Sequence, residues 1–278
     1  MVRPSRVIER KPRSAGSRFQ TYVKNYAISN DEPEKSLLGG CRRRTGGRNC
    51  YGRITTRHRG GGADQKYRIV DFARSERNVP GEVVSIQYDP NRNIPILLVN
   101  YPNGNKKYIL HPEGVKVGDT VAAGMNVEAT VGNCLPMKNI PVGLFVHNIE
   151  MVPDQGGKLV RSAGAAAQLM AKKDGYVTLK MPSGEERLIN EDCWATVGVL
   201  ANAGYKNISI GKAGRNRHRG WRPSVRGMAM NPVDHPRGGG EGRSKSGTKP
   251  MSPWGKCSQG TKTRKRKSRF IITHSKKR

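Results

Sequence analysis

The sequence lacks features that several large classes of protein require. Aromatic residues make up only 6% of the chain, and no apolar run approaches the roughly 18–20 residues of a membrane-spanning helix. No apolar segment of the secretory type lies near Met1. Glycine (34 residues) and proline (17 residues) are abundant instead, which favours short strands and tight turns over one large helical core. The sequence therefore predicts no membrane partner and a largely non-helical fold.

Motifs for enzymatic chemistry are also missing. The chain has no G-x-S-x-G elbow, no G-x-x-x-x-G-K phosphate loop and no H-E-x-x-H zinc motif. Asp234 and His235 could be a general base and its orienting group, but adjacent residues rarely orient each other, and no nucleophile is evident nearby. We therefore expect no catalytic residue and no cofactor. A nuclease or acyl-transfer enzyme that uses this pair is the alternative.

The cysteines are few and scattered, at positions 41, 50, 134, 193 and 257. No two of them have the two-to-four-residue gap of a zinc knuckle, so we expect reduced thiols in a cytosolic-type compartment. Cys41 and Cys50 flank an arginine run and could bind a metal together with His58. Because no second close-spaced pair of ligands exists, the sequence predicts no metal site.

What the sequence does have is positive charge, and it lies at the two ends. Residues 1–60 contain 15 Lys and Arg against 4 Asp and Glu, and residues 201–278 contain 21 against 2. Residues 61–200 contain 15 of each, so the whole net charge of +30 lies outside the middle. Self-repulsion of this size opposes compaction, so we do not expect the ends to order without an anionic partner. That partner should be a nucleic acid.

Each basic end also has a second interpretation. The Arg- and Gly-rich stretch 41–62 could be a flexible linker, although linkers are usually rich in Ser or Pro. The run 262–269 could be a solvated or localisation tail, although the segment before it has the same composition. Trp221 and Trp254 could be core residues, could stack on a base or sugar, or could pin the segment to its own domain. Charge alone would fit a DNA-compacting protein equally well.

The middle of the chain has the pattern of a β protein. Turn residues separate short apolar or alternating runs in a first set, which lie at 67–72, 81–88, 96–101, 107–110 and 118–121. A second set follows Gly132, with 144–152 as its longest predicted strand and further runs at 176–181 and 187–189. Residues 163–171 could form a short helix between them.

Two predicted hairpins repeat one pattern. Residues 98–109 contain the turn Pro102-Asn103-Gly104, and residues 179–189 contain Pro182-Ser183-Gly184. Asn103-Gly104 supplies the positive φ angles that a tight hairpin demands. The repeat predicts an all-β fold with two small barrels in series, each of which buries one face of its strands.

Two segments outside the barrels combine glycine with arginine. In 46–62, arginines offer planar donors to phosphate while glycines let the backbone approach closely. In 230–243, two prolines stiffen a loop around His235, and a glycine run follows. The residues that we expect to contact RNA are Arg53, Arg57, His58, Arg59, Arg215, Arg217, Arg219, Trp221, Arg222, His235, Arg237, Arg243, Lys262, Arg264, Lys265, Arg266 and Lys267.

Several short segments occur in an order that is familiar from one family. They are RITTRHRGGG at 53–62, YRIVDF at 67–72, NIPVG at 139–143, HNIE at 147–150, RSAG at 161–164, NPVDHP at 231–236 and GGGEG at 238–242. Together they resemble large ribosomal subunit protein two in its bacterial and organellar branch. The resemblance runs from about Lys11 to the C-terminus, and the NPVDHP loop is its most specific part.

The resemblance implies a basic N-terminal extension at 1–60, an oligonucleotide-binding-fold barrel at 61–126, an SH3-like barrel at 127–203 and a basic C-terminal extension at 204–278. The implied partners are large-subunit ribosomal RNA, other ribosomal proteins and the small subunit at the subunit interface. The implied role is structural: assembly of the peptidyl-transferase region and subunit association, with peptidyl transfer carried by RNA. The simplest location is the ribosome of a bacterial cytoplasm, with an organelle-encoded product as the alternative.

The resemblance also places one loop near the peptidyl-transferase centre. Its residues are Asn231, Pro232, Asp234, His235 and Pro236, and His235 matches the family's much-discussed histidine. The family commonly has a second histidine two residues further on, where this chain has Arg237. No mechanism that needs both imidazoles is therefore expected. We expect His235 to act through the shape of the loop instead.

Overall fold

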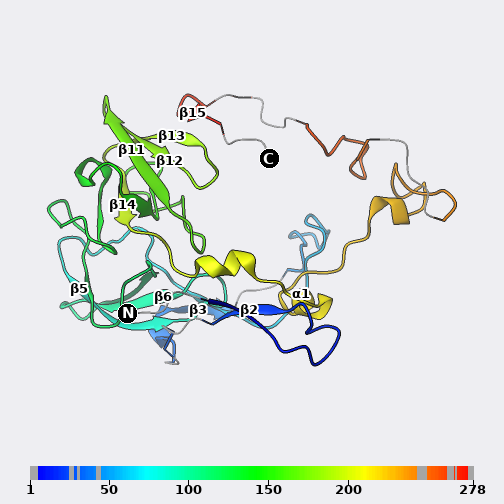
Figure 1. Cartoon of the computed structure of the whole chain (residues 1–278), viewed down its shortest axis with the longest axis horizontal. Helices are drawn as coiled ribbons and strands as arrows, with labels where there is room; N and C mark the ends of the chain where they lie inside the picture. Colours follow the sequence, from blue (N-terminus) through cyan, green and yellow to red (C-terminus); the bar gives the residue numbers. More distant parts are fainter. Residues whose placement is uncertain are drawn as a thin grey trace. The chain divides into compact units, whose positions relative to one another are not determined.

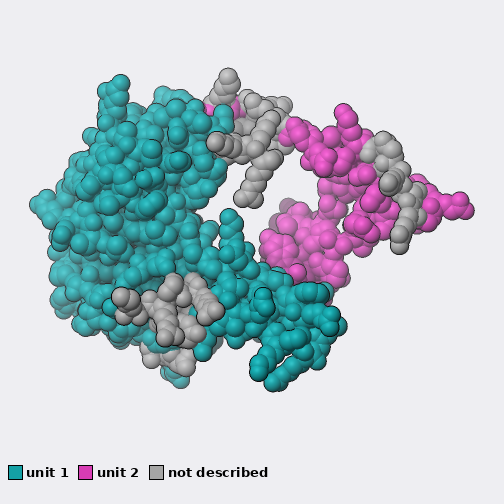
Figure 2. All heavy atoms as spheres, in the orientation of Figure 1, with its two compact units in different colours: residues 1–43, 64–213, 269–278 teal, residues 44–63, 214–268 magenta. Residues whose placement is uncertain are grey.

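The chain forms two compact units (Figure 2). The computed structural model describes residues 6–24, 28–29, 32–41, 45–242, 249–261, 266 and 268–274. Unit 1 comprises residues 1–43, 64–213 and 269–278, and unit 2 comprises residues 44–63 and 214–268. Each unit therefore combines stretches that are distant in sequence. The four segments predicted above are, in contrast, each continuous in sequence.

The first sheet of unit 1 is antiparallel and has four strands in the order β7-β6-β5-β8. Figure 1 labels β5 and β6 of this sheet. Its strands are β5 (Gly81–Gln87), β6 (Ile96–Asn100), β7 (Lys106–Leu110) and β8 (Thr120–Val121). Strand β6 is buried on both faces, because Leu97 and Val99 pack into one apolar cluster while Ile96 and Leu98 pack into another. These strands match the runs expected from the sequence.

The second sheet of unit 1 has seven strands in the order β15-β13-β12-β11-β10-β14-β9. Its strands are β9 (Cys134–Pro136), β10 (Phe145–His147), β11 (Ala167–Lys173), β12 (Tyr176–Lys180), β13 (Glu186–Asn190), β14 (Trp194–Val197) and β15 (Ile271–Thr273). One apolar cluster, which includes Leu135, Leu169 and Leu179, forms its core. The predicted all-β class with two small β structures in series is confirmed.

The two repeated hairpins close with the same hydrogen bonds. The Tyr101 N–H donates to the Asn105 carbonyl at 2.9 Å, and the Met181 N–H donates to the Glu185 carbonyl at 2.8 Å. In each turn the glycine has a positive φ, 81° at both Gly104 and Gly184. Asn103 does not, so the prediction of two consecutive positive φ angles was wrong: the turn is one residue longer and needs only its glycine in that region.

Three of the predicted elements differ from the structure. The run 67–72 is a strand only at β4 (Lys66–Arg68), because the Asp71 carboxylate accepts the N–H groups of the turn that follows. The strand predicted at 144–152 ends at His147, because the next residue, Asn148, has a φ of 49°.

The helix expected at 163–171 is absent: residues 163–166 form a turn and irregular backbone, and residues 167–171 belong to β11, the longest strand of the second sheet. Ala167 and Leu169 are fully buried and alternate with more exposed neighbours, which is the period of a strand. Tertiary packing thus overrides the helix propensity of the alanines in this stretch.

Described residues before position 44 pack on unit 1, the first hairpin against η3 (Ala203–Asn207) and residues 29–37 against the first sheet. Strands β1 (Arg6–Glu9) and β2 (Thr21–Lys24) form a hairpin, and a 3₁₀ turn, η1 (Lys35–Leu37), leads into β3 (Leu38–Cys41), which pairs with β4. The Glu34 N–H donates to the buried hydroxyl of Tyr108 at 2.9 Å, and its carboxylate binds Lys106. Part of the basic N-terminal end is therefore built onto the barrel.

Helical structure in the described residues is confined to short pieces. Besides η1 they are η2 (Met137–Asn139), η3 (Ala203–Asn207), α1 (Ala213–His218) and η4 (Gly227–Ala229). Within the ranges that the structure describes, no helix has the length and apolar character needed to cross a bilayer.

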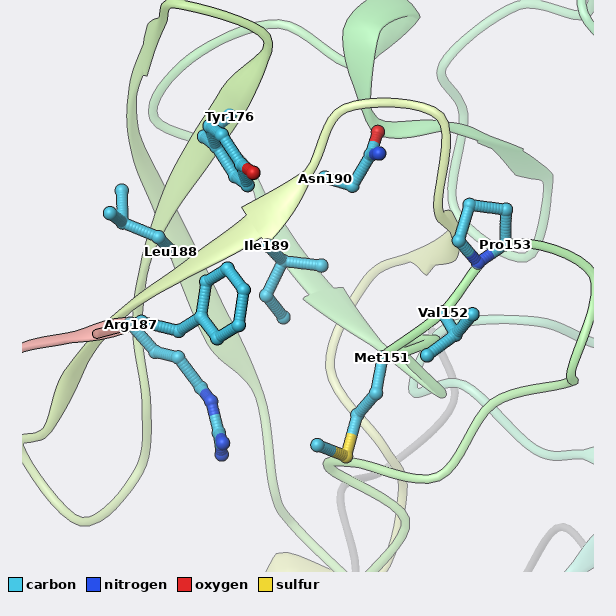
Figure 3. Close-up of a pocket in the computed structure, with 9 residues that line it drawn as sticks. Met151, Val152, Pro153, Tyr176, Arg187, Leu188, Ile189 and Asn190 are labelled. Carbon is cyan, nitrogen blue, oxygen red and sulfur yellow. The ribbon is translucent and has the colours of Figure 1, made fainter. Parts of the chain in front are cut away.

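The end of the chain returns to the second sheet. Strand β15 pairs with β13, and the Leu188 N–H donates to the Phe270 carbonyl at 2.8 Å. A cavity of about 330 Å³ lies beside this junction (Figure 3), lined by Met151, Val152, Pro153, Tyr176, Arg187, Leu188, Ile189, Asn190 and Phe270. The described residues on its wall include no carboxylate, histidine or thiol, so the cavity offers no acid–base pair.

Candidate nucleic-acid interface

Unit 2 has the composition of a polyanion-binding surface. Its two stretches contain 20 Lys and Arg against only Asp234 and Glu241. At least 18 of these cations cannot be neutralised by a carboxylate within the unit. Among its described residues, His235 is the only buried side chain. The described part of unit 2 therefore has no apolar core of the kind found in unit 1.

Residues 45–57 form a loop that is held by its own backbone and by one asparagine. The Asn49 side chain accepts the N–H groups of Tyr51 and Arg53, each at 3.0 Å. The Thr55 and Thr56 N–H groups both donate to the Gly47 carbonyl, at 2.9 and 3.0 Å. Gly47 has a φ of 76°, and a methyl group there would lie 2.0 Å from the Thr56 carbonyl oxygen. Only glycine fits this close approach.

The next residues of this stretch pair with residues 216–222. The Gly60 N–H donates to the Gly220 carbonyl at 3.0 Å, and the Ala63 N–H donates to the His218 carbonyl at 2.8 Å. In the other direction, the Arg222 N–H donates to the His58 carbonyl at 3.1 Å. Backbone hydrogen bonds thus join a part of each basic end, residues 44–63 and 214–268, into one unit.

This pairing gathers most of the predicted RNA-contacting residues into one unit. Its exposed members are Arg53, Arg57, Arg59, Arg217, Arg219, Trp221 and Arg222, and its half-exposed members are His58 and Arg215. The helix α1 buries no side chain, so it serves to space its arginines rather than to fill a core. Planar guanidinium groups at this density suit phosphate recognition.

Both tryptophans of unit 2 lie under arginines from the 44–63 stretch. The guanidinium carbon of Arg59 is 4.1 Å from the Trp221 ring centroid, and that of Arg57 is 5.2 Å from the Trp254 centroid. Such contacts are cation–π interactions. Each indole thus contacts an arginine from the other stretch of unit 2, and the RNA contact of Trp221 stays a prediction. Trp254 was not among the predicted RNA-contacting residues, and its isolation within cationic sequence was the available signal.

The loop Asn231–Pro236 is organised around the His235 ring. His235 is 7% exposed, and its Nδ1 accepts the backbone N–H of Arg237 at 3.1 Å. The ring packs flat on Gly227, where a methyl group would lie 2.3 Å from the ring. In the neutral tautomer that this bond implies, the proton is on Nε2. One nitrogen of the imidazole is therefore used to hold the loop, and the Asn231, Pro232, Asp234 and Pro236 side chains are exposed.

Some of the predicted residues fall outside what the structure describes. These are Arg243, Lys262, Arg264, Lys265 and Lys267, whereas Arg266 is described and exposed. Among the described residues, no three potential metal ligands cluster, and Cys50 is an exposed free thiol. Burial raises the pKa of the Cys193 thiol to about 12, which keeps this barrel cysteine protonated and unreactive.

Comparison with known families gives two adjacent matches. Residues 34–123 match the description "Ribosomal Proteins L2, RNA binding N-terminal domain". Residues 130–255 match "Ribosomal Proteins L2, C-terminal domain". The first match contains the loop at 45–57, and the second contains α1, Trp221, Trp254 and the His235 loop.

Proposed function

This chain belongs to the ribosomal protein L2 family, and we propose that unit 2 is its main contact with large-subunit ribosomal RNA. Membership makes the chain a structural protein of the large ribosomal subunit with an RNA-binding N-terminal domain. Its partners are ribosomal RNA and other ribosomal proteins, and its location is the ribosome. The proposal assigns the RNA contacts to particular residues.

One observation carries this proposal: 20 cations meet two carboxylates in a unit without an apolar core. Held together in the absence of counter-charge, these groups repel each other. Phosphates of RNA would relieve that repulsion and release their condensed counterions, which is the main driving force of such binding.

We extend the proposal to the finer roles. The His235 loop would lie near the peptidyl-transferase centre and support its assembly, and the chain would take part in subunit association at the small-subunit interface. The buried His235 ring and its bond to the Arg237 N–H support a structural role, in which the imidazole shapes the loop while RNA performs peptidyl transfer. The ribosome would be of bacterial type, in a bacterial cytoplasm or an organelle.

The test of RNA binding measures affinity against salt concentration for large-subunit RNA and for duplex DNA of equal length. Replacing Arg53, Arg57 and Arg59 by Gln should lower the slope of log affinity against log salt by about 2 to 3, since each lost phosphate contact removes roughly 0.7–0.9. A matched control replaces three exposed lysines of unit 1, Lys116, Lys173 and Lys180, and should leave the slope unchanged. Equal losses in both variants, or a preference for DNA, would contradict the proposal.

The role of His235 is tested with His235→Gln in fully assembled subunits. Gln keeps an acceptor for the Arg237 N–H but does not titrate near neutral pH, so peptidyl transfer should keep its rate and its pH profile. His235→Ala leaves that N–H without its acceptor and should impair assembly. A loss of a titration step near pH 6–7 with Gln, together with a rate about a hundredfold lower, would identify the histidine as a general base instead.

A further inference from the structure

The two arginine–tryptophan contacts of unit 2 have the same construction. Each takes its cation from the stretch 44–63 and its ring from the stretch 214–268, which lie far apart in sequence. Trp221 is 46% exposed and Trp254 is 74% exposed, so neither ring is there to fill a core. In both contacts the cation comes from the first stretch and the ring from the second, so one explanation should account for both.

The backbone fixes the closer of the two contacts. Arg59 and Trp221 form a β-bridge, flanked by the Gly60 to Gly220 and Arg222 to His58 hydrogen bonds. The second ring, Trp254, stands on a tight turn that is closed by the Ser252 N–H to Lys256 carbonyl bond at 2.8 Å. Both rings are thus presented on ordered backbone rather than on a free tail.

A stacked guanidinium keeps its binding capacity for phosphate. The ring contacts one flat face of the group, whereas the N–H donors lie in its plane and point outward from its edges. Those edges match two phosphate oxygens in bidentate geometry. Stacking therefore restricts the rotamers of a long side chain without using any of the donors that bind RNA.

We propose that Trp221 and Trp254 are positioning residues that hold Arg59 and Arg57 flat and direct their N–H edges to phosphodiester oxygens of the RNA. This inference rests on the proposed function of unit 2. It differs from the expectation that Trp221 itself contacts RNA, because here the tryptophan acts through the arginine. Holding a flexible cation in its bound conformation strengthens binding by lowering the entropy lost on association.

The inference makes different predictions for the two partners of one pair. Arg59→Gln removes a phosphate contact, so both the affinity and the salt slope should fall, the slope by about 0.7–0.9. Trp221→Leu leaves the charge in place, so the salt slope should stay constant while affinity for large-subunit RNA falls about threefold to tenfold. If Trp221 instead stacked on an RNA base, Trp221→Leu would lower the affinity for RNA even when Arg59 had been replaced.

The decisive experiment is a double-mutant cycle on the full chain with large-subunit RNA. Wild type, Arg59→Gln, Trp221→Leu and the double variant are compared at several salt concentrations. The expected result is that Trp221→Leu has no further effect once Arg59 is replaced. Additive effects of the two substitutions would overturn the inference and point to direct contact of the indole with a base.

Two further measurements separate positioning from folding. Trp221→Phe keeps an aromatic face under Arg59 and should retain most of the affinity, whereas a loss as large as that of Trp221→Leu would overturn the inference. Hydrogen exchange at the Gly60 and Arg222 amides, which join the two stretches, should be unchanged in both variants. Faster exchange that accounts for the whole affinity loss would also overturn the inference.

The wild-type protein distinguishes the two proposals. If wild type itself shows no salt-dependent binding, the proposed function fails; if wild type binds and the cycle is additive, only this inference fails.

The pair Arg57 and Trp254 provides an internal comparison. Its separation is larger, 5.2 Å against 4.1 Å, and its ring is more exposed, so its contact is weaker. Trp254→Leu should therefore lower affinity less than Trp221→Leu, again at constant salt slope. An effect of Trp254→Leu that persists in an Arg57→Gln background would contradict the proposal for this pair.

Discussion

The interactions that stabilise unit 1 internally differ from those that stabilise unit 2. Unit 1 buries apolar clusters on both faces of β6 and inside the second sheet, and pairs cations with carboxylates, as Lys107 does with Glu76. In the described part of unit 2, one histidine is buried, and the segments are joined by backbone hydrogen bonds, glycine turns and two arginine–tryptophan contacts. Burial of apolar surface is non-directional and persists in any salt, whereas a cationic unit depends on the charge around it.

The difference indicates a division of roles within one chain. A domain with an apolar core is stable by itself and can present other segments, while a unit with +18 net charge gains its stability from a polyanion. Under the proposed function, unit 1 is the part that is stable by itself, and unit 2 is the part that ribosomal RNA would stabilise.

The largest expected effect is on hydrogen exchange of the free protein. Amides in β5 to β7 and the Glu34 amide, which donates to Tyr108, should exchange at least about a thousandfold more slowly than the Gly60 and Thr56 amides. Global opening is required in unit 1 but only local opening in unit 2. Adding large-subunit RNA should slow exchange in unit 2, and equal protection of both units without RNA would remove the distinction between them.

A pair of truncations measures the same contrast as free energy of unfolding. Leu179→Ala, at a fully buried site, should lower it by about 2–5 kcal/mol because a cavity remains in the core. Ile54→Ala, at a site 60% exposed, should change it by less than about 0.5 kcal/mol. Urea unfolding followed by the fluorescence of buried Trp194 reports the first value, and hydrogen exchange at the Thr55 and Thr56 amides of unit 2 reports the second; similar losses would show that unit 2 also depends on apolar packing.

Acid should destabilise unit 1 through a buried histidine. Burial lowers the pKa of His147 from 6.5 to about 4, and its Nδ1 lies 2.8 Å from the Gly198 carbonyl. The unfolded chain therefore binds a proton more readily, so this stability is complete above about pH 6.5 and is lost as the pH falls toward 4. The expected loss between pH 7 and pH 5 is about 2 kcal/mol.

The control for the pH effect is His147→Asn, which should flatten this dependence. Burial lowers the pKa of His111 as well, so a smaller slope of the same sign should remain. An unchanged slope in His147→Asn would show that other groups control the acid sensitivity of the barrels.

The smallest effect is expected where the tail meets the second sheet. Phe270→Ala removes a half-buried ring beside β13 and should lower the free energy of unfolding by about 1 kcal/mol, without changing the salt dependence of RNA binding.

Replacing the Lys and Arg residues of the run 262–267 by Gln should leave the free energy of unfolding of the barrels unchanged and should flatten the salt slope of RNA binding. If Phe270→Ala flattened the slope, the strand β15 would belong functionally to the RNA-binding part.

The parts of the fold that the sequence predicted correctly are local ones. The hairpins at Pro102–Gly104 and Pro182–Gly184 follow from turn residues, because only glycine adopts their positive φ without strain. The predictions of secondary structure were wrong where contacts between residues far apart in sequence determine the backbone conformation. Asn148 ends β10 with a side-chain bond to the Phe72 carbonyl, and the alanines of β11 form a strand because the core lies against them.

By itself, the sequence determined the β class and the segregation of charge to the two ends, because turn chemistry, alternation and charge are properties of neighbouring residues. Only the tertiary structure decided that residues 44–63 and 214–268 combine into one unit, that Arg59 stacks on Trp221, and that His235 is buried within its own loop. These pairings depend on backbone hydrogen bonds between segments far apart in the chain, and no local periodicity encodes which distant segment a basic stretch will meet.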